Sequence, residues 1–134
     1  MKILSKIIVA LAFLAINPVA SASPLYLGNV DLSDQLEREV LKLPPCSASW
    51  NRPVTEVKLE VRRNAADIEF VRVKFQNGDT YRLNVREFFQ VNSSSRWIDL
   101  QGYARCIREI RIVGDAVTFG HTPRKKSRIF LLGR

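Results

Sequence analysis

Apolar and polar residues alternate with a period of two along much of the chain, which is the pattern of strands with one buried and one solvated face. The clearest runs lie at residues 57–62, 71–75 and 81–86. Asn77-Gly78-Asp79 lies between the second and third runs. Because Asn-Gly between alternating segments is a strong hairpin signal, we expect a β-hairpin over residues 68–85.

The remaining strands are expected at short intervals. They are Leu25–Leu32, Trp97–Leu100, Cys106–Val113 and Ser127–Leu132. The third of these breaks strict alternation once, which predicts a bulge or a register change near Arg108. Ser33–Lys42 is the one stretch with helical character, with Ser33 as its cap and Pro44-Pro45 as its stop. We expect one or two helical turns there, and residues 40–43 are either the end of this turn or extended chain.

Seven to nine short strands in about 110 residues, separated by turn-rich breaks, indicate an all-β fold. We predict a single-domain antiparallel β-sandwich or jelly roll with one disulfide. A closed barrel is the alternative architecture.

The first 22 residues have the composition of a cleaved signal peptide. Lys2 and Lys6 precede an apolar run of 10 residues at 7–16, and Ala20-Ser21-Ala22 is an A-x-A cleavage site. A membrane-spanning helix needs about 20 apolar residues, so an uncleaved anchor is the weaker interpretation. The predicted mature domain is 23–134, without a membrane span, and it is periplasmic or secreted. Cleavage removes two Lys and no acidic residue, so the formal net charge falls from +8 to +6.

Cys46 and Cys106 are the two cysteines of the chain. In an oxidising compartment an even count predicts a disulfide, here across 60 positions. A redox-active pair is the rival interpretation, but the C-x-x-C spacing that it favours is missing. Two cysteines and one histidine leave no visible metal-ligand spacing, and we expect no metal and no cofactor.

The basic residues are the first candidate for function. Nine cations make up the candidate anion-binding set, six on strands expected to be neighbours and three near the C-terminus: Lys58, Arg62, Arg72, Lys74, Arg82, Arg86, Arg124, Lys125 and Lys126. If the strands pair, this surface would attract an anionic envelope glycan or lipopolysaccharide. The alternative is a solvated sheet face whose field is diluted by interspersed glutamates. Nucleic acid is a weaker candidate, because no nucleic-acid-binding signature is present.

The aromatic residues offer a second candidate. Trp50, Trp97 and Tyr103 would form a platform for sugar rings, although packing in or beside the core is the commoner fate of such side chains. Phe88 and Phe89 are adjacent, so a strand sends them to opposite faces and one of them should be exposed or covered by a loop.

Catalysis finds little support in the chain. His121 stands alone in a Gly-His-Thr-Pro segment, and no G-x-S-x-G nucleophile elbow is present. A carboxylate pair from Asp99 and Glu109 is conceivable but cannot be read from sequence. We therefore assign no catalytic residues and expect a non-enzymatic protein.

Four segments resemble the YaaI-like family of small exported bacterial proteins of unknown function. They are Leu41-Lys42-Leu43-Pro44-Pro45-Cys46, Val71-Arg72-Val73-Lys74-Phe75, Trp97-Ile98-Asp99-Leu100-Gln101-Gly102 and Arg105-Cys106-Ile107 with the strand after it. The third and fourth are also similar to a broader group of exported β-sandwich domains. The resemblance implies export, an all-β fold and a Cys46–Cys106 bridge, and it implies no catalytic residues.

Three functions of different classes therefore remain open. The favoured one is a binding or structural module of the cell envelope with a basic surface. A protein-interaction module, such as an enzyme inhibitor, would instead need an exposed apolar patch or a protruding loop. A small hydrolase would need a concave pocket around His121 or two carboxylates.

Overall fold

A computed structural model describes residues 24–46, 51–117 and 126–134. These residues form ten strands and no helix. The strands are β1 Leu25–Leu32, β2 Glu37–Lys42, β3 Glu56–Arg62, β4 Ala65–Phe75, β5 Thr80–Leu83, β6 Glu87–Phe89, β7 Ser93–Ser94, β8 Ile98–Asp99, β9 Ile107–Val117 and β10 Ser127–Gly133. Within the described part of the chain, no helix is long and apolar enough to cross a membrane.

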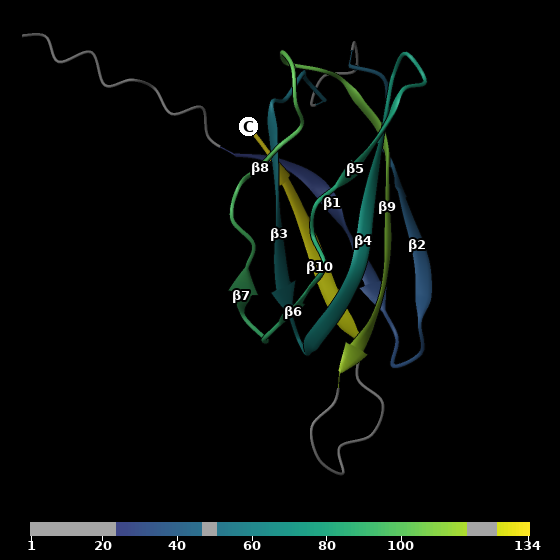
Figure 1. Cartoon of the computed structure of the whole chain (residues 1–134), viewed down its shortest axis with the longest axis vertical. Coiled ribbons are helices and arrows are strands. Elements are labelled where there is room, and N and C mark those ends of the chain that lie inside the picture. The colour runs from purple at the N-terminus through teal and green to yellow at the C-terminus, as the bar shows by residue number, and fades with distance from the viewer. Residues whose placement is uncertain (1–23, 47–50, 118–125) are drawn as a thin grey trace, which may run out of the picture.

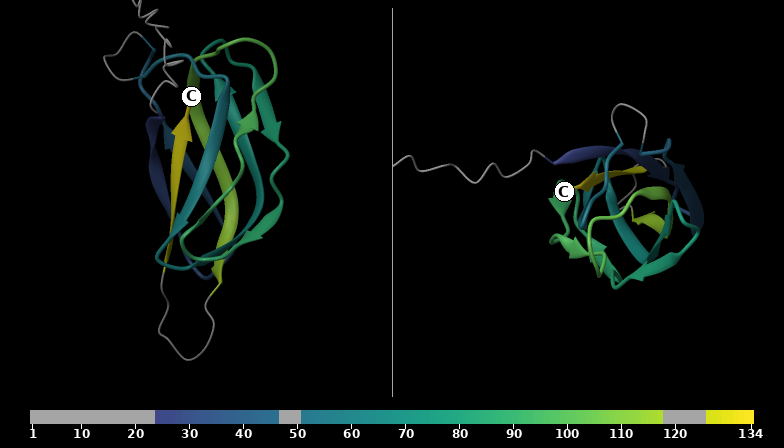
Figure 2. Two further views of the ribbon diagram at one scale, coloured as in Figure 1. Left: turned by 90° about the vertical axis from the view of Figure 1, so that its left-hand side faces the viewer. Right: turned by 90° about the horizontal axis from the view of Figure 1, so that it is seen from above.

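The strands form two antiparallel sheets packed face to face, which confirms the predicted β-sandwich (Figure 1). Sheet A has the order β1-β10-β3-β7, and β8 pairs with β3 beside β7. Sheet B has the order β2-β9-β4-β5, and β6 pairs with β4 beside β5. The last position of each sheet is therefore one interrupted strand, and these two interruptions raise the number of strands above the predicted seven to nine. Figure 2 shows the two layers end on.

The hairpin and the bulge both lie where the sequence predicts them. β4 and β5 pair from Val71↔Leu83 to Lys74↔Thr80, and Gly78 takes a φ of 92° in the turn between them. Lys74 pairs with Glu109 and Phe75 with Ile107, so Arg108 is the extra residue of a bulge in β9.

The helix predicted over Ser33–Lys42 is wrong. Residues 37–42 form the edge strand β2, which pairs with β9 from Glu37↔Gly114 to Lys42↔Glu109. The Leu41 side chain packs against the core and lies over Gly28, where a Cβ atom would come within 2.8 Å of Leu41 Cδ1. Pairing with a long neighbour and burial of Leu41 outweigh the local helical signal, because helix propensity is a weak preference that tertiary contacts override.

The core is the apolar layer between the two sheets. Alternate residues of β3 and β10, including Val57, Leu59 and Ile129, are fully buried from sheet A. Ile68, Val71 and other inward residues of β4 and β9 meet them from sheet B. Each fully buried aliphatic side chain contributes about 1.5–3 kcal/mol. One face of every long strand is thereby committed to the interior, and the other face is free for charged residues.

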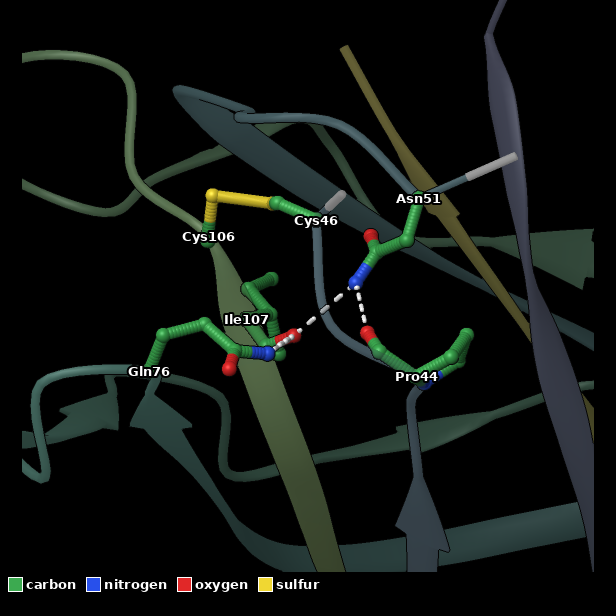
Figure 3. The surroundings of a disulfide bond; sticks show 6 residues. All are labelled: Pro44, Cys46, Asn51, Gln76, Cys106 and Ile107. Carbon is green, nitrogen blue, oxygen red and sulfur yellow. Dashed lines mark hydrogen bonds between the residues drawn. A yellow bond between two sulfur atoms is a disulfide. The ribbon is translucent and has the colours of Figure 1, made fainter. Parts of the chain in front are cut away.

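The disulfide Cys46–Cys106 joins the chain after β2 to the start of β9, with the Cα atoms 5.9 Å apart (Figure 3). Asn51 lies beside it, 3% exposed, and its Nδ2 donates to the carbonyl oxygens of Pro44 at 2.6 Å and Ile107 at 3.2 Å. Gln76 Nε2 donates to the same Ile107 oxygen at 3.2 Å. The bridge and these side-chain amides together hold the end of the sandwich where three connections converge.

Replacing both cysteines by serine removes a constraint on the unfolded chain across a separation of 60 residues. We expect the free energy of unfolding to fall by about 4 kcal/mol in urea denaturation. A thiol assay on the unreduced, unfolded wild-type protein should detect no free thiol. Two reactive thiols in that assay would contradict the bridge.

Candidate functional site

The structure divides the predicted basic surface between two sheets. β3 belongs to sheet A, so Lys58 and Arg62 lie on its outer face, whereas Arg72, Lys74 and Arg82 lie on the outer face of sheet B. The expectation that all these strands share a face is therefore corrected. The reason is that the chain passes from one sheet to the other between β3 and β4, through Arg63 at a φ of 71°.

Residues from two further strands complete a basic face on sheet B. Directly opposed residues on antiparallel strands share one side of the sheet. One row across sheet B is Val40, Arg111, Arg72 and Arg82, and the row beside it is Lys42, Glu109, Lys74 and Thr80. Arg38, opposite Val113, lies next to the first row. We call Arg38, Lys42, Arg72, Lys74, Arg82 and Arg111 the basic face.

In the part of the chain that the structure describes, the cations of the basic face make no ion pair, although Glu109 lies directly opposite Lys42 and Lys74. No ion pair joins any of the six to a carboxylate within the described residues. Arg82 and Arg72 instead lie over the ring of Phe70, at 4.6 and 5.9 Å from its centroid. The Nε of Arg111 is buried without a hydrogen-bond partner. Like charges directly opposite each other destabilise a sheet, so this row carries a cost that an anion would offset.

The outer face of sheet A is built differently. Three of its arginines are paired: Arg128 Nε donates to Asp31 at 2.9 Å, Arg62 pairs with Glu60 at 3.1 Å, and Arg134 pairs with Glu56. The hydrogen bond from Arg128 lowers the pKa of Asp31 from its ordinary value. Arg128 lies directly opposite Arg62 on this face, but each of the two has its own carboxylate partner, as on an ordinary solvated surface.

Acidic residues gather at the other end of sheet B. Asp67 and Asp115 are directly opposed on β4 and β9, and Glu69 is nearby on β4. Burial, together with the charges of Asp67 and Glu69, raises the pKa of Asp115. On the outer face of sheet B most cations therefore lie in the middle and at one end, with Glu109 among them, and Asp67, Glu69 and Asp115 lie at the other end.

A groove of about 730 Å³ lies between the two interrupted edge strands. Its walls are residues 84–90 of the β5–β6 segment and residues 93–96 of the β7–β8 segment. Val85, Phe89 and Ile98 form the buried apolar floor, and Arg86, an exposed predicted cation, lies on the rim. Phe88 is 45% exposed and Phe89 is 4% exposed, which confirms that the two rings take opposite faces.

Of the three residues of the predicted aromatic platform, the structure describes Trp97 and Tyr103. Trp97 is half-buried on sheet A, with the Arg134 guanidinium at 4.3 Å and the Lys58 Nζ at 5.6 Å from its ring centroid. Tyr103 is 84% exposed in the bend before Arg105. Trp50, His121, Arg124 and Lys125 fall outside the described residues, and Lys126 is exposed just before β10.

Three members of the basic face escaped the sequence reasoning, namely Arg38, Lys42 and Arg111. Arg38 and Lys42 fall in the segment predicted as helical, and a helical pattern does not indicate which residues of neighbouring strands they lie opposite. Arg111 does carry a signal, because the bulge at Arg108 sets residues 109, 111, 113 and 115 on the outward side of β9. When these outward residues of β9 are paired with those of β4, Arg111 lies directly opposite Arg72.

Comparison with known proteins supplies a family. The model of a domain of unknown function, DUF2541, matches residues 7–133. The chain belongs to this family. No curated protein and no solved structure matches the chain. In the part of the DUF2541 chain that the structure describes, no group of three or more His, Cys, Asp or Glu is placed to hold a metal ion.

The acidic end makes a prediction about pH. Because the pKa of Asp115 is raised by folding, the folded state is favoured at low pH and loses that advantage as the pH rises through the folded pKa. Asp115→Asn should therefore stabilise the protein at pH 7 by about 0.5 kcal/mol and have no effect at low pH, where the carboxyl is protonated.

Denaturation in urea at the two pH values measures this difference. Glu109→Gln is the matched control, because Glu109 is opposed to Lys42 and Lys74 on the same face and its loss should not stabilise. A loss of stability at pH 7 on substituting Asp115 would contradict the like-charge account.

Proposed function

We propose that this DUF2541 protein is an exported, non-enzymatic module that binds an anionic polymer of the cell envelope through the basic face of sheet B. The ligand class is an acidic glycan or lipopolysaccharide. The observation that carries the proposal is the row Arg82, Arg72 and Arg111, three opposed guanidinium groups with no carboxylate partner in the described residues.

The separation of charge supports binding over simple solubility. A surface selected for solubility alone mixes its signs, as sheet A does with three ion pairs. Arg62 and Arg128 are also opposed on sheet A, but each has a carboxylate partner there. Sheet B opposes Arg to Arg without such partners, and Asp to Asp, which is unfavourable in the free protein. Clustered positive charge attracts a polyanion and speeds its association, so the arrangement is favourable once a ligand is bound.

Export rests on the N-terminal pattern and on the disulfide. The match to the family model begins at residue 7, at the start of the apolar run, so this run belongs to the family pattern. A disulfide persists in oxidising compartments such as the periplasm or the exterior. The same features and the four quoted segments support the finer placement among YaaI-like exported proteins.

Charge reversal on sheet B tests the proposal. Arg72→Glu together with Arg82→Glu should abolish salt-sensitive retention on a heparin column. The single variant Arg72→Glu sets a carboxylate between Arg82 and Arg111, so its free energy of unfolding should stay equal or rise by up to about 1 kcal/mol while retention falls.

Lys58→Glu with Arg62→Glu is the matched control, since it reverses two charges on the outer face of sheet A. Its retention should fall much less than that of the sheet B variant. Equal losses in the two double variants would show that only net charge matters and would overturn the proposal. Unchanged retention of the sheet B variant would overturn it as well.

A further inference from the structure

We propose that the groove between the two interrupted edge strands binds an acidic polysaccharide, with Arg86 and Arg96 on its carboxylates and the edge backbone on its hydroxyls. This inference rests on the proposed function and deepens it. It selects a hydroxyl-rich carboxylated chain from among the polyanions that the basic face alone would accept.

The groove forms where the edge strand of sheet A, β7 and β8, and the edge strand of sheet B, β5 and β6, are both interrupted. The chain leaves β4 between Leu83 and Glu87, and it leaves β3 between Ser94 and Ile98. In Figure 1 the β5–β6 segment runs alongside β4, and the β7–β8 segment runs alongside β3. The two gaps face each other across the open edge of the sandwich, and both line the groove.

The gaps leave hydrogen-bond donors without acceptors. The backbone N–H groups of Asn84, Arg86 and Arg96 make no hydrogen bond within the described chain. The guanidinium groups of Arg86 and Arg96 have no ion-pair partner there either. Backbone donors need a partner, and a guanidinium binds a carboxylate through two parallel hydrogen bonds. The groove therefore fits a ligand rich in oxygen acceptors.

A partner β-strand fits the groove poorly. Strand addition requires a continuous row of backbone groups on an edge, and short interrupted edges are a means of preventing such pairing. Here β6 has three residues and β7 and β8 have two each. The free backbone N–H groups of the groove are separated from one another by side chains. Such isolated donors suit a polysaccharide, whose oxygen acceptors are spaced irregularly along a chain of sugar rings.

Glu87 narrows the ligand class. Glu87 lines the same groove as Arg86 and Arg96 and has no ion-pair partner in the described residues. An ionised carboxylate only accepts hydrogen bonds, so it accepts from sugar hydroxyls and repels any anionic group. This repulsion is smaller for a chain with one carboxylate on each sugar than for a densely sulfated or phosphorylated one. Carboxylates for two arginines and hydroxyls for Glu87 together describe a uronic-acid chain.

The groove and the basic face adjoin each other. The β5–β6 segment carries Arg82 on the outer side of sheet B and Arg86 at the groove rim. A polysaccharide that enters the groove at Arg96 would cross this segment and continue onto the arginine row. The basic face would thus contribute electrostatic attraction to one part of the polysaccharide, and the groove would contribute specificity for another part of the same chain.

Calorimetric titration of the full mature protein with a short oligogalacturonate tests the inference. Saturable binding is expected, and Arg86→Gln with Arg96→Gln should weaken it at least about tenfold, because hydrogen bonds to charged groups are lost. Lys58→Gln with Arg62→Gln is the charge-matched control and should change affinity much less. Neutral dextran should not bind.

Glu87→Ala separates sugar recognition from plain charge attraction. If Glu87 accepts from hydroxyls, its removal weakens oligogalacturonate binding. If the groove merely attracts anions, removal of a negative charge tightens binding, and this result would overturn the inference.

The two proposals fail in distinguishable ways. If the wild-type protein is retained on heparin through Arg72 and Arg82 but does not bind oligogalacturonate, the groove inference is overturned and the basic face stands. If oligogalacturonate binding needs Arg86 and Arg96 while charge reversal at Arg72 and Arg82 leaves heparin retention unchanged, the groove stands and the basic face fails.

Discussion

Burial of one face of each sheet against the other is the constraint on which the rest of this DUF2541 structure depends. Once alternate residues such as Leu59 and Val71 enter the shared core, every intervening residue is assigned to one of two outer surfaces. The crossing between β3 and β4 then decides which surface. It places Lys58 on sheet A and Arg72 on sheet B, although the two residues lie on consecutive strands.

The two outer surfaces distribute charge in different ways. On sheet A, Arg62, Arg128 and Arg134 each have a carboxylate partner, although Arg62 and Arg128 are directly opposed. On sheet B, Arg72 opposes Arg111 and Asp67 opposes Asp115 across β4 and β9, and Lys74 and Glu109 form the one pair of opposite sign among the charged pairs of these two strands. Since both surfaces are wet, solubility alone does not account for this difference, and the polyanionic ligand that we propose for sheet B would account for it.

Local patterns in the sequence predicted much of the fold, because alternation and turn chemistry are properties of neighbouring residues. Asn77-Gly78 marked the hairpin, and the broken alternation near Arg108 marked the bulge. The single Cys pair marked the disulfide. The strand β2 was missed because its residues satisfy a helical pattern equally well and only pairing with β9 settles the choice.

The candidate site was less predictable, because it depends on which distant strands are neighbours. Arg72, Lys74 and Arg82 were found through their hairpin, but Arg38 and Arg111 join them only by the register of β2 and β9. Similarly, the groove needs two gaps, at residues 84–86 and 95–97, to lie opposite each other. No local sequence pattern predicts that these two gaps lie opposite each other, because their relative position is set by the packing of the two sheets.

The most direct test of the central claim is a map of backbone amide shifts during titration of the isotope-labelled mature protein with a heparin oligosaccharide. We predict saturable changes in amide chemical shift that cluster on β4, β5 and β9 around Arg72, Arg82 and Arg111. We predict little change on β3 and β10 of sheet A. Changes centred on Lys58 and Arg62, or spread evenly over both sheets, would contradict the claim.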